Sequence, residues 1–163
     1  DTGFAFRAAF RKPDWWLSGQ DARLEAAGLR EVLDAYTRKA VTTYAGLDRV
    51  FSPRLQARGG LAGEISQITR NGVTMNYQLI GLPFSILYNR TNNDLDPTRG
   101  YRIDGEVTPW FSVGPSGDFF TVLRLTGRTY VDLAEPGRTV LATRGSLGSE
   151  PAISIGGIPP ALL

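Results

Sequence analysis

Long, strict alternation between apolar and polar residues constrains the fold of this chain more than any other feature. Between residues 101 and 111, apolar or small residues occupy the odd positions and mostly polar residues stand between them. Successive side chains of a β-strand point to opposite faces, so a two-residue period predicts a strand with one apolar face. Residues 21–31 contain good helix formers, but their alternation favours a strand. The same period recurs over residues 2–12, 36–51, 55–66, 123–132 and 139–149.

Short connections between these runs predict antiparallel pairing. Ser52-Pro53-Arg54 leaves room only for a tight turn, and Asn71-Gly72 is typical of a two-residue hairpin. Further turns are predicted at residues 114–117 and 135–137. The apolar run 73–88 contains Pro83, which lacks an N–H donor and predicts a bulge or a locally unpaired stretch. The sequence predicts one all-β domain over residues 1–163, an antiparallel up-and-down meander of about eight long strands.

The length of the predicted strands favours a membrane barrel. Strands of soluble proteins average about 5–6 residues, whereas several runs here keep one phase for about ten. A strand of that length, tilted by about 40°, spans roughly 25 Å, the height of the apolar band of an outer-membrane barrel. We therefore expect part of a transmembrane β-barrel. A soluble β-meander binding module shows the same alternation turned inside out, so it stays an alternative.

Aromatic residues gather toward both ends of the predicted strands, as in the two girdles of a membrane barrel. The first predicted girdle consists of Trp15, Trp16, Phe51, Tyr88, Tyr101 and Tyr130. The second consists of Tyr36, Trp110, Phe111, Phe119 and Phe120.

Composition excludes several classes of chemistry. The 163 residues include no cysteine and no histidine, which excludes disulfides, thiolate metal sites and Ser-His mechanisms. Basic and acidic residues are spread along the chain rather than clustered, which argues against a nucleic-acid partner. There is also no run of about 18 apolar residues that could form a transmembrane helix. We predict no catalytic residue, no metal and no cofactor.

One connection is unusually rich in turn-forming residues. It contains short amides and carboxylates that bond their own backbone, a proline that fixes φ, and a glycine that tolerates positive φ. The sequence therefore predicts a tight hairpin connection between two long strands. The turn-forming residues singled out as structural are Asp94, Asp96, Pro97, Thr98, Arg99 and Gly100.

This connection also carries a family resemblance. With Asp94-Leu-Asp-Pro-Thr-Arg-Gly-Tyr101, Gly81-Leu-Pro-Phe84 and Ile158-Pro-Pro-Ala-Leu162, the chain resembles the barrel of TamA-like autotransporter assembly factors. These factors belong to the bacterial surface-antigen superfamily, which includes BamA and the two-partner secretion transporters. The Asp-Pro-Thr-Arg-Gly turn is typical of the superfamily, and the flanking runs indicate the TamA-like branch.

The resemblance implies a partial barrel of the cell outer membrane, with POTRA domains and a signal before Asp1 and roughly sixteen strands in all. It implies that the Asp94–Gly100 connection is periplasmic and that residues 71–72, 114–117 and 150–163 are extracellular. The implied function is insertion or secretion of autotransporter-type β-barrel proteins. The implied partners are outer-membrane lipid, substrate β-barrel proteins and a periplasm-spanning, TamB-like protein. An outer-membrane barrel enzyme and a two-partner secretion transporter are the alternatives.

Charged residues of the predicted strands share one alternation phase. Two interpretations stay open: a charged lumen wall that pairs with an inward loop or guides a substrate, and polar side chains that fill a wet lumen. Asp104 and Glu106 match a glycosidase pair by residue type, but carboxylates two positions apart are common on strands. The candidate lumen-facing charges are Arg102, Asp104, Glu106, Arg124, Arg128, Asp132 and Arg144, in the same phase as Arg7, Arg23, Glu25, Arg58 and Glu64.

Overall fold

The computed structural model describes residues 2–32, 37–70, 72–113, 118–134 and 139–151, and it is all-β. Among these residues no helix is long and apolar enough to cross a membrane. The strands are β1 (Thr2–Lys12), β2 (Gln20–Val32), β3 (Thr37–Ser52), β4 (Leu55–Arg70), β5 (Val73–Gly81), β6 (Phe84–Asn89), β7 (Gly100–Ser112), β8 (Phe119–Ala134) and β9 (Thr139–Ser149).

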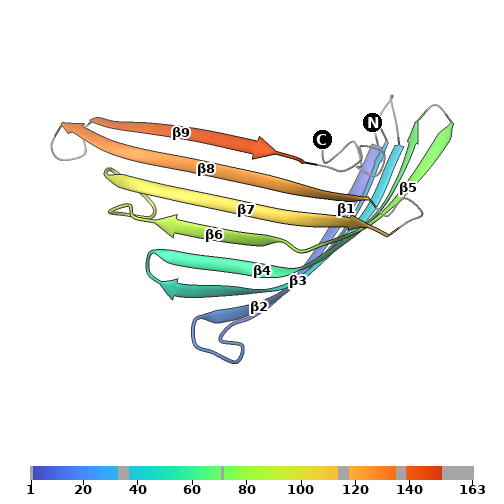
Figure 1. The fold of residues 1–163 in the computed structure, drawn as a ribbon, viewed down its shortest axis with the longest axis horizontal. Helices are drawn as coiled ribbons and strands as arrows, with labels where there is room; N and C mark the ends of the chain where they lie inside the picture. Colours follow the sequence, from blue (N-terminus) through green and yellow to red (C-terminus); the bar gives the residue numbers. More distant parts are fainter. Residues whose placement is uncertain (1, 33–36, 71, 114–117, 135–138, 152–163) are drawn as a thin grey trace.

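The strands form one antiparallel sheet in sequence order, β1-β2-β3-β4-β5-β7-β8-β9, with β6 between β4 and β7 (Figure 1). This confirms the predicted up-and-down meander, including the strand rather than helix at β2. Figure 1 also shows that the sheet is strongly curved. The tight turn at Ser52-Pro53-Arg54 is confirmed, and the Ser52 hydroxyl accepts hydrogen bonds there from the N–H groups of Arg54 and Leu55.

The predicted run 73–88 is one strand interrupted at Pro83. β5 pairs with the second half of β4, and β6 pairs with its first half, so the two segments occupy one place in the sheet. At the break, the Leu82 N–H donates to the Pro109 carbonyl at 3.0 Å and the Gly60 N–H donates to the Pro83 carbonyl at 3.1 Å. The predicted local irregularity is confirmed. The alternation continues across it, because Ile80 and Phe84 lie on the same face of the sheet.

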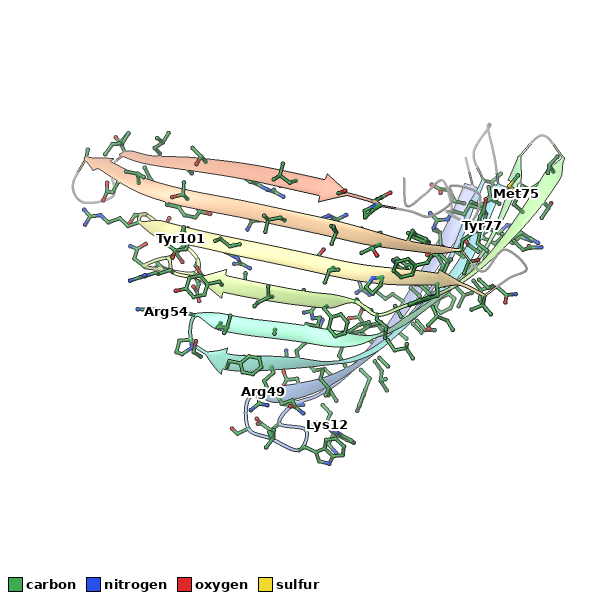
Figure 2. All side chains as sticks on the ribbon, in the orientation of Figure 1. Lys12, Arg49, Arg54, Met75, Tyr77 and Tyr101 are labelled. Atoms are coloured by element: carbon green, nitrogen blue, oxygen red, sulfur yellow. The ribbon has the colours of Figure 1, made fainter. Side chains whose placement is uncertain are left out.

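The sheet has two ends, which we name after the connections found there. The Asp94 end contains the connections at residues 13–19, 53–54 and 90–99, and the Gly72 end contains the connection between β4 and β5. In Figure 2, Lys12, Arg49 and Arg54 mark the Asp94 end, whereas Met75 and Tyr77 mark the Gly72 end. The predicted turns at 114–117 and 135–137, Asn71 and the tail from residue 152 lie outside the described residues.

The two faces of the sheet differ in chemistry. Cross-strand register places Phe6, Leu24, Leu61, Ile103 and Leu125 on one side, which we call the apolar face. These side chains are exposed, Phe6 by 57% and Ile103 by 42%. We call the other side the polar face. A soluble β-meander requires the apolar face to point inward, whereas this face is exposed in the sheet that the described residues form.

A small apolar cluster lies on the polar face near the Gly72 end. Phe120 is fully buried there against Leu79, and Trp110 packs against them with its ring centroid 6.4 Å from that of Phe120. Phe111 and Phe119, their strand neighbours, form a ring pair on the opposite, apolar face. The second predicted girdle is therefore correct for Phe111 and Phe119 and wrong for Trp110 and Phe120. Tyr36 lies outside the described residues.

The first predicted girdle is also only partly correct. Tyr88 and Tyr101 form a ring pair on the apolar face, with centroids 5.9 Å apart, and Trp15 and Trp16 lie in the first connection of the Asp94 end. Tyr130 shares the phase of the polar face, because it is opposite Gly100 and two residues from Arg128. For the aromatic residues of both girdles, the position along the strand was thus predicted better than the face of the sheet on which the side chain lies.

The buried position of Phe120 generates a stability prediction. We expect F120A to lower the free energy of unfolding by about 3–5 kcal/mol, because it empties a packed site. We expect the control F119A to cost only about 1 kcal/mol, the loss of one exposed aromatic pair. Urea unfolding of the intact protein in liposomes, followed by tryptophan fluorescence, measures both. Equal losses for the two variants would contradict a buried cluster around Phe120.

Candidate functional site

The polar face carries a chain of ion pairs across β1 to β4. Glu25 of β2 pairs with Arg7 of β1 at 2.5 Å and with Arg23 at 3.3 Å. Asp48 of β3 continues the chain, with one oxygen 3.0 Å from Arg23 and the other 2.6 Å from Arg58 of β4. These arginines alternate with carboxylates, so each carboxylate is shared between two cations. The chain stiffens the polar face rather than leaving free charge on it.

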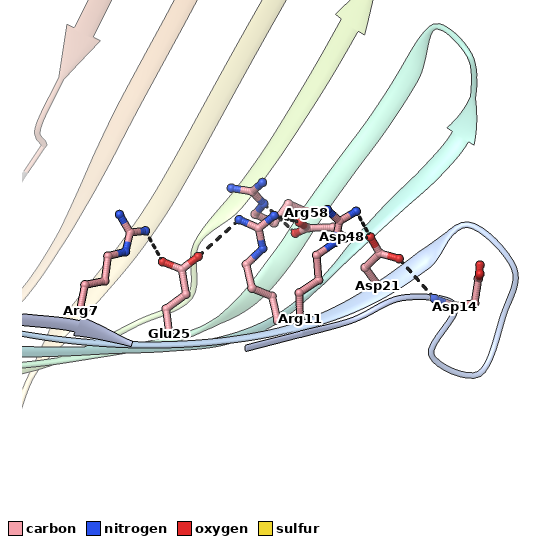
Figure 3. A network of polar contacts seen from close by, with 8 residues as sticks. Arg7, Arg11, Asp14, Asp21, Glu25, Asp48 and Arg58 are labelled. Atoms are coloured by element: carbon pink, nitrogen blue, oxygen red, sulfur yellow. Dashed lines mark hydrogen bonds and ion pairs between the residues drawn. The ribbon is translucent and has the colours of Figure 1, made fainter. Parts of the chain in front are cut away.

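Figure 3 shows the geometry of this network. The labelled arginines and carboxylates stand on the side of β1 and β2 toward which the later strands curve. Arg11 and Asp21 extend it toward the first connection, where Asp21 also accepts a hydrogen bond from the Asp14 N–H at 3.3 Å. A hollow of about 400 Å³ opens on this side. Its lining spans β1 to β7 and includes Arg7, Glu25, Tyr44, Arg58, Ser85 and Glu106, so the polar face is the concave one.

The predicted charges of β7, β8 and β9 all lie on this polar face. Glu106 pairs with Arg124 at 3.4 Å, and both side chains are well exposed. Asp104 stands opposite Thr126, which shares a hydroxyl contact with Ser146 of β9 at 3.2 Å. The register therefore places these charges on one face of the sheet. Glu64, in the same phase, is nearly buried and pairs with Arg38 at 3.4 Å.

Three of the predicted arginines form a row that the sequence did not indicate. Arg102, Arg128 and Arg144 stand directly opposite one another on β7, β8 and β9. Within the described residues none of the three forms an ion pair, and the buried Nε of Arg102 has no hydrogen-bond partner. Like charges directly opposite each other are destabilising. The row is thus the part of the polar face with positive charge available to an acidic partner.

The Asp94–Gly100 connection is longer than the predicted tight hairpin, because no strand is formed between Asn89 and Gly100. Two asparagines organise it. The side-chain oxygen Oδ1 of Asn92 accepts hydrogen bonds from the N–H groups of Thr98 and Arg99, both at 3.0 Å. The Asn93 side chain accepts from Leu95 at 2.9 Å. The prediction of short amides that bond their own backbone is confirmed for Asn92 and Asn93.

The residues singled out in this connection have more modest roles. Asp94 accepts a hydrogen bond from the Asn89 amide at 2.6 Å. Gly100 has φ of +107°, and a Cβ there would lie 2.1 Å from the Arg90 carbonyl oxygen, so only glycine fits. Asp96 contributes its backbone N–H, which donates to the Asn93 side chain. Pro97 lies between residues 95–96, which are hydrogen-bonded to Asn93, and residues 98–99, which are hydrogen-bonded to Asn92. Pro97 has no N–H to donate, and its ring fixes φ at this position of the connection.

One ion pair joins this connection to the polar face. Arg99 lies 3.6 Å from Asp132 of β8, whose side chain is 5% exposed. The structure therefore brings together two predicted groups that are far apart in sequence, the turn and the candidate lumen charges. No local sequence signal indicates this contact, because it depends on the register of β7 with β8.

The described residues offer no metal centre, since no group of three or more acidic side chains is placed to hold an ion. The polar face is instead a continuous charged surface, with ion pairs on β1 to β4 and a row of arginines on β7 to β9. Such a surface can bind or guide a polar polypeptide segment through ion pairs and hydrogen bonds.

Comparisons with known proteins give the fold a family. The model of the Omp85 superfamily domain matches residues 4–162. The crystal structure of BamA from Haemophilus ducreyi lacking POTRA domains 1–3 is similar, with a TM-score of 0.80 and 15% sequence identity. The match covers 95% of this chain but only 34% of that chain, so this chain spans about a third of its length. No curated protein matches the chain.

The ion-pair chain generates a second stability prediction. We expect D48N to lower the free energy of unfolding by about 1–3 kcal/mol, because two half-buried arginines lose one shared carboxylate. We expect E106Q to change it by less than about 1 kcal/mol, because its pair with Arg124 is exposed. Urea unfolding of the intact protein in liposomes tests both. A larger loss for E106Q than for D48N would contradict the ranking.

Proposed function

Because the chain belongs to the Omp85 superfamily, we propose that it is a barrel segment of an outer-membrane factor that inserts or translocates β-barrel proteins. We propose further that the factor is TamA-like and serves autotransporter-type substrates. Its work is assembly rather than covalent chemistry. The Asp94 end is periplasmic and the Gly72 end extracellular in this proposal.

One observation carries the membrane part of the proposal: acidic residues keep strictly to one face. Every acidic residue within the described strands has the phase of the polar face, from Asp21 in β2 to Asp132 in β8. The apolar face instead exposes large side chains, such as Phe4 at 61% and Ile65 at 63%. This distribution suits a sheet that encloses water and faces lipid, and would be unfavourable for a sheet in water.

Support for the TamA-like branch comes from two runs outside the connection at the Asp94 end, Gly81-Leu-Pro-Phe84 and Ile158-Pro-Pro-Ala-Leu162. The connection itself carries the Asp-Pro-Thr-Arg-Gly sequence that is typical of the superfamily, and Arg99 ties it to Asp132 on the polar face. A fixed connection of this kind suits a periplasmic surface that contacts a TamB-like, periplasm-spanning partner. The partner and the substrate class are proposals that this contact motivates.

The polar face suggests how this barrel segment contributes to the assembly of other β-barrel proteins. The row of Arg102, Arg128 and Arg144, which forms no ion pair within the described residues, attracts carboxylates of an inward-folded segment or of a passing substrate. The edges of the described sheet, β1 and β9, are each hydrogen-bonded on one side only within the described residues. Assembly by strand addition uses such edges, because an incoming strand gains main-chain hydrogen bonds there. In the intact barrel the strands that open belong to the rest of the protein.

A two-partner secretion transporter is the second candidate, because it belongs to the same superfamily. The two differ in substrate: an assembly factor leaves a folded β-barrel in the membrane, whereas a transporter releases an extended protein on the far side. A test of substrate class therefore separates them.

We predict that proteoliposomes with the intact protein accelerate folding of an autotransporter β-domain by at least about tenfold, a barrier lowered by about 1.4 kcal/mol. Heat-modifiable mobility of the folded β-domain on gels measures the rate. Empty liposomes and liposomes with an unrelated outer-membrane barrel are the controls. No acceleration over these controls, or passage of a two-partner exoprotein alone, would contradict an assembly factor.

A further inference from the structure

Only basic residues carry charge on the apolar face of the described strands. Register places Lys12, Arg30, Lys39 and Arg49 there. Each stands within three residues of a strand end. A lipid-facing Arg or Lys costs roughly 2–4 kcal/mol at the middle of a membrane and roughly 0–1 kcal/mol near its surface. Their placement therefore fits the two membrane surfaces.

The two pairs of cations differ in their partners. At the Asp94 end, Lys12 lies 4.5 Å from the ring centroid of Trp15, and Arg49 lies 5.0 Å from that of Phe51. At the Gly72 end, Arg30 and Lys39 are direct cross-strand neighbours of β2 and β3. Within the described residues neither forms an ion pair or a ring contact. Two like charges held side by side without a partner favour binding of an anion.

A row of polar side chains extends this cationic pair across four strands. Lys39 is opposite Gln67 of β4, and Gln67 is opposite Asn76 of β5. The amides of Gln67 and Asn76 are hydrogen-bonded to each other at 3.0 Å. Arg30, Lys39, Gln67 and Asn76 thus lie at one height on the apolar face, where they offer donors to a headgroup.

An apolar groove of about 610 Å³ adjoins this polar row. Its floor lies two residues further from the strand ends, with Gly28, Val41 and Ile65 in register on β2, β3 and β4. The Phe6 ring lies directly over Gly28, since a Cβ at Gly28 would be 2.1 Å from Phe6 Cε1. The groove is therefore lined by a flat ring on one side and by exposed aliphatic side chains on the other.

We propose that this groove binds lipid A, the phosphorylated and multiply acylated glycolipid of the outer leaflet. A phosphate lies between Arg30 and Lys39, and an acyl chain runs along Val41 and Ile65. The proposal rests on the proposed outer-membrane location, with the Gly72 end at the outer leaflet. Charge and shape both select the ligand, because the site joins two cations to a groove that suits a hydrocarbon chain.

The test measures retention of radiolabelled diphosphoryl lipid A by the intact protein in phosphatidylcholine nanodiscs. We expect R30Q/K39Q to weaken binding by at least about tenfold, because two charge-assisted hydrogen bonds are lost. The matched control K12Q/R49Q removes the same charge from the same face at the other end and leaves binding unchanged. V41W keeps both cations but fills the groove, so we expect it to weaken lipid A binding as well. It tests the same site if R30Q/K39Q fails to fold.

Two further arms separate the lipid from a free anion. We expect dephosphorylated lipid A to bind at least about tenfold more weakly, and inorganic phosphate not to displace the lipid. Displacement by inorganic phosphate, unchanged binding by R30Q/K39Q, or an equal loss for K12Q/R49Q would overturn the proposal. The experiments distinguish a failure of the lipid A proposal from a failure of the proposed assembly function. Normal substrate folding without lipid A binding rejects only the lipid site, and lipid A binding without substrate folding rejects only the assembly role.

Discussion

Backbone hydrogen bonding between long neighbouring strands holds this structure together, because the described residues contain almost no buried apolar core. Its buried hydrophobic residues are Ala40, Tyr77, Leu79 and Phe120. A sheet with so small a core is stable where lipid covers its apolar face, and there each unpaired backbone group costs several kcal/mol. The pairing of each strand with its neighbours from β1 to β9 meets that demand, with register shifts only near the strand ends at residues 50–52 and 132–134. Even at Pro83, where the ladder breaks, Gly60 and Leu82 find backbone acceptors.

The same register determines what each face can do. Since the alternation keeps one phase over most of each strand, one face collects the acidic residues and the other collects exposed apolar side chains. On the polar face, β1 to β4 are neutralised by shared ion pairs such as those of Asp48, whereas β7 to β9 present the arginine row of Arg102, Arg128 and Arg144. On the apolar face, charge remains only near the strand ends. A sheet with one charged face and one apolar face therefore follows from one periodic pattern.

The sequence was sufficient for properties that are local and insufficient for those that depend on register. Alternation predicted the strands and the antiparallel meander, and Pro83 predicted the break, because these follow from neighbouring residues. The inward facing of Phe120 was missed although it shares the phase of Arg124, because the girdle was predicted from position along the strands and not from phase. The contact between Arg99 and Asp132 was missed because strand register brings together residues distant in sequence.

The central claim is that the apolar face meets lipid and the polar face meets water, and adjacent residues of β7 test it most directly. The chain has no cysteine, so single cysteines at Ile103 and Asp104 report without further changes. In the intact protein in liposomes, the account predicts that a lipid-restricted reagent labels I103C and a water-soluble one labels D104C. The reverse pattern, or the same pattern at both positions, would contradict it.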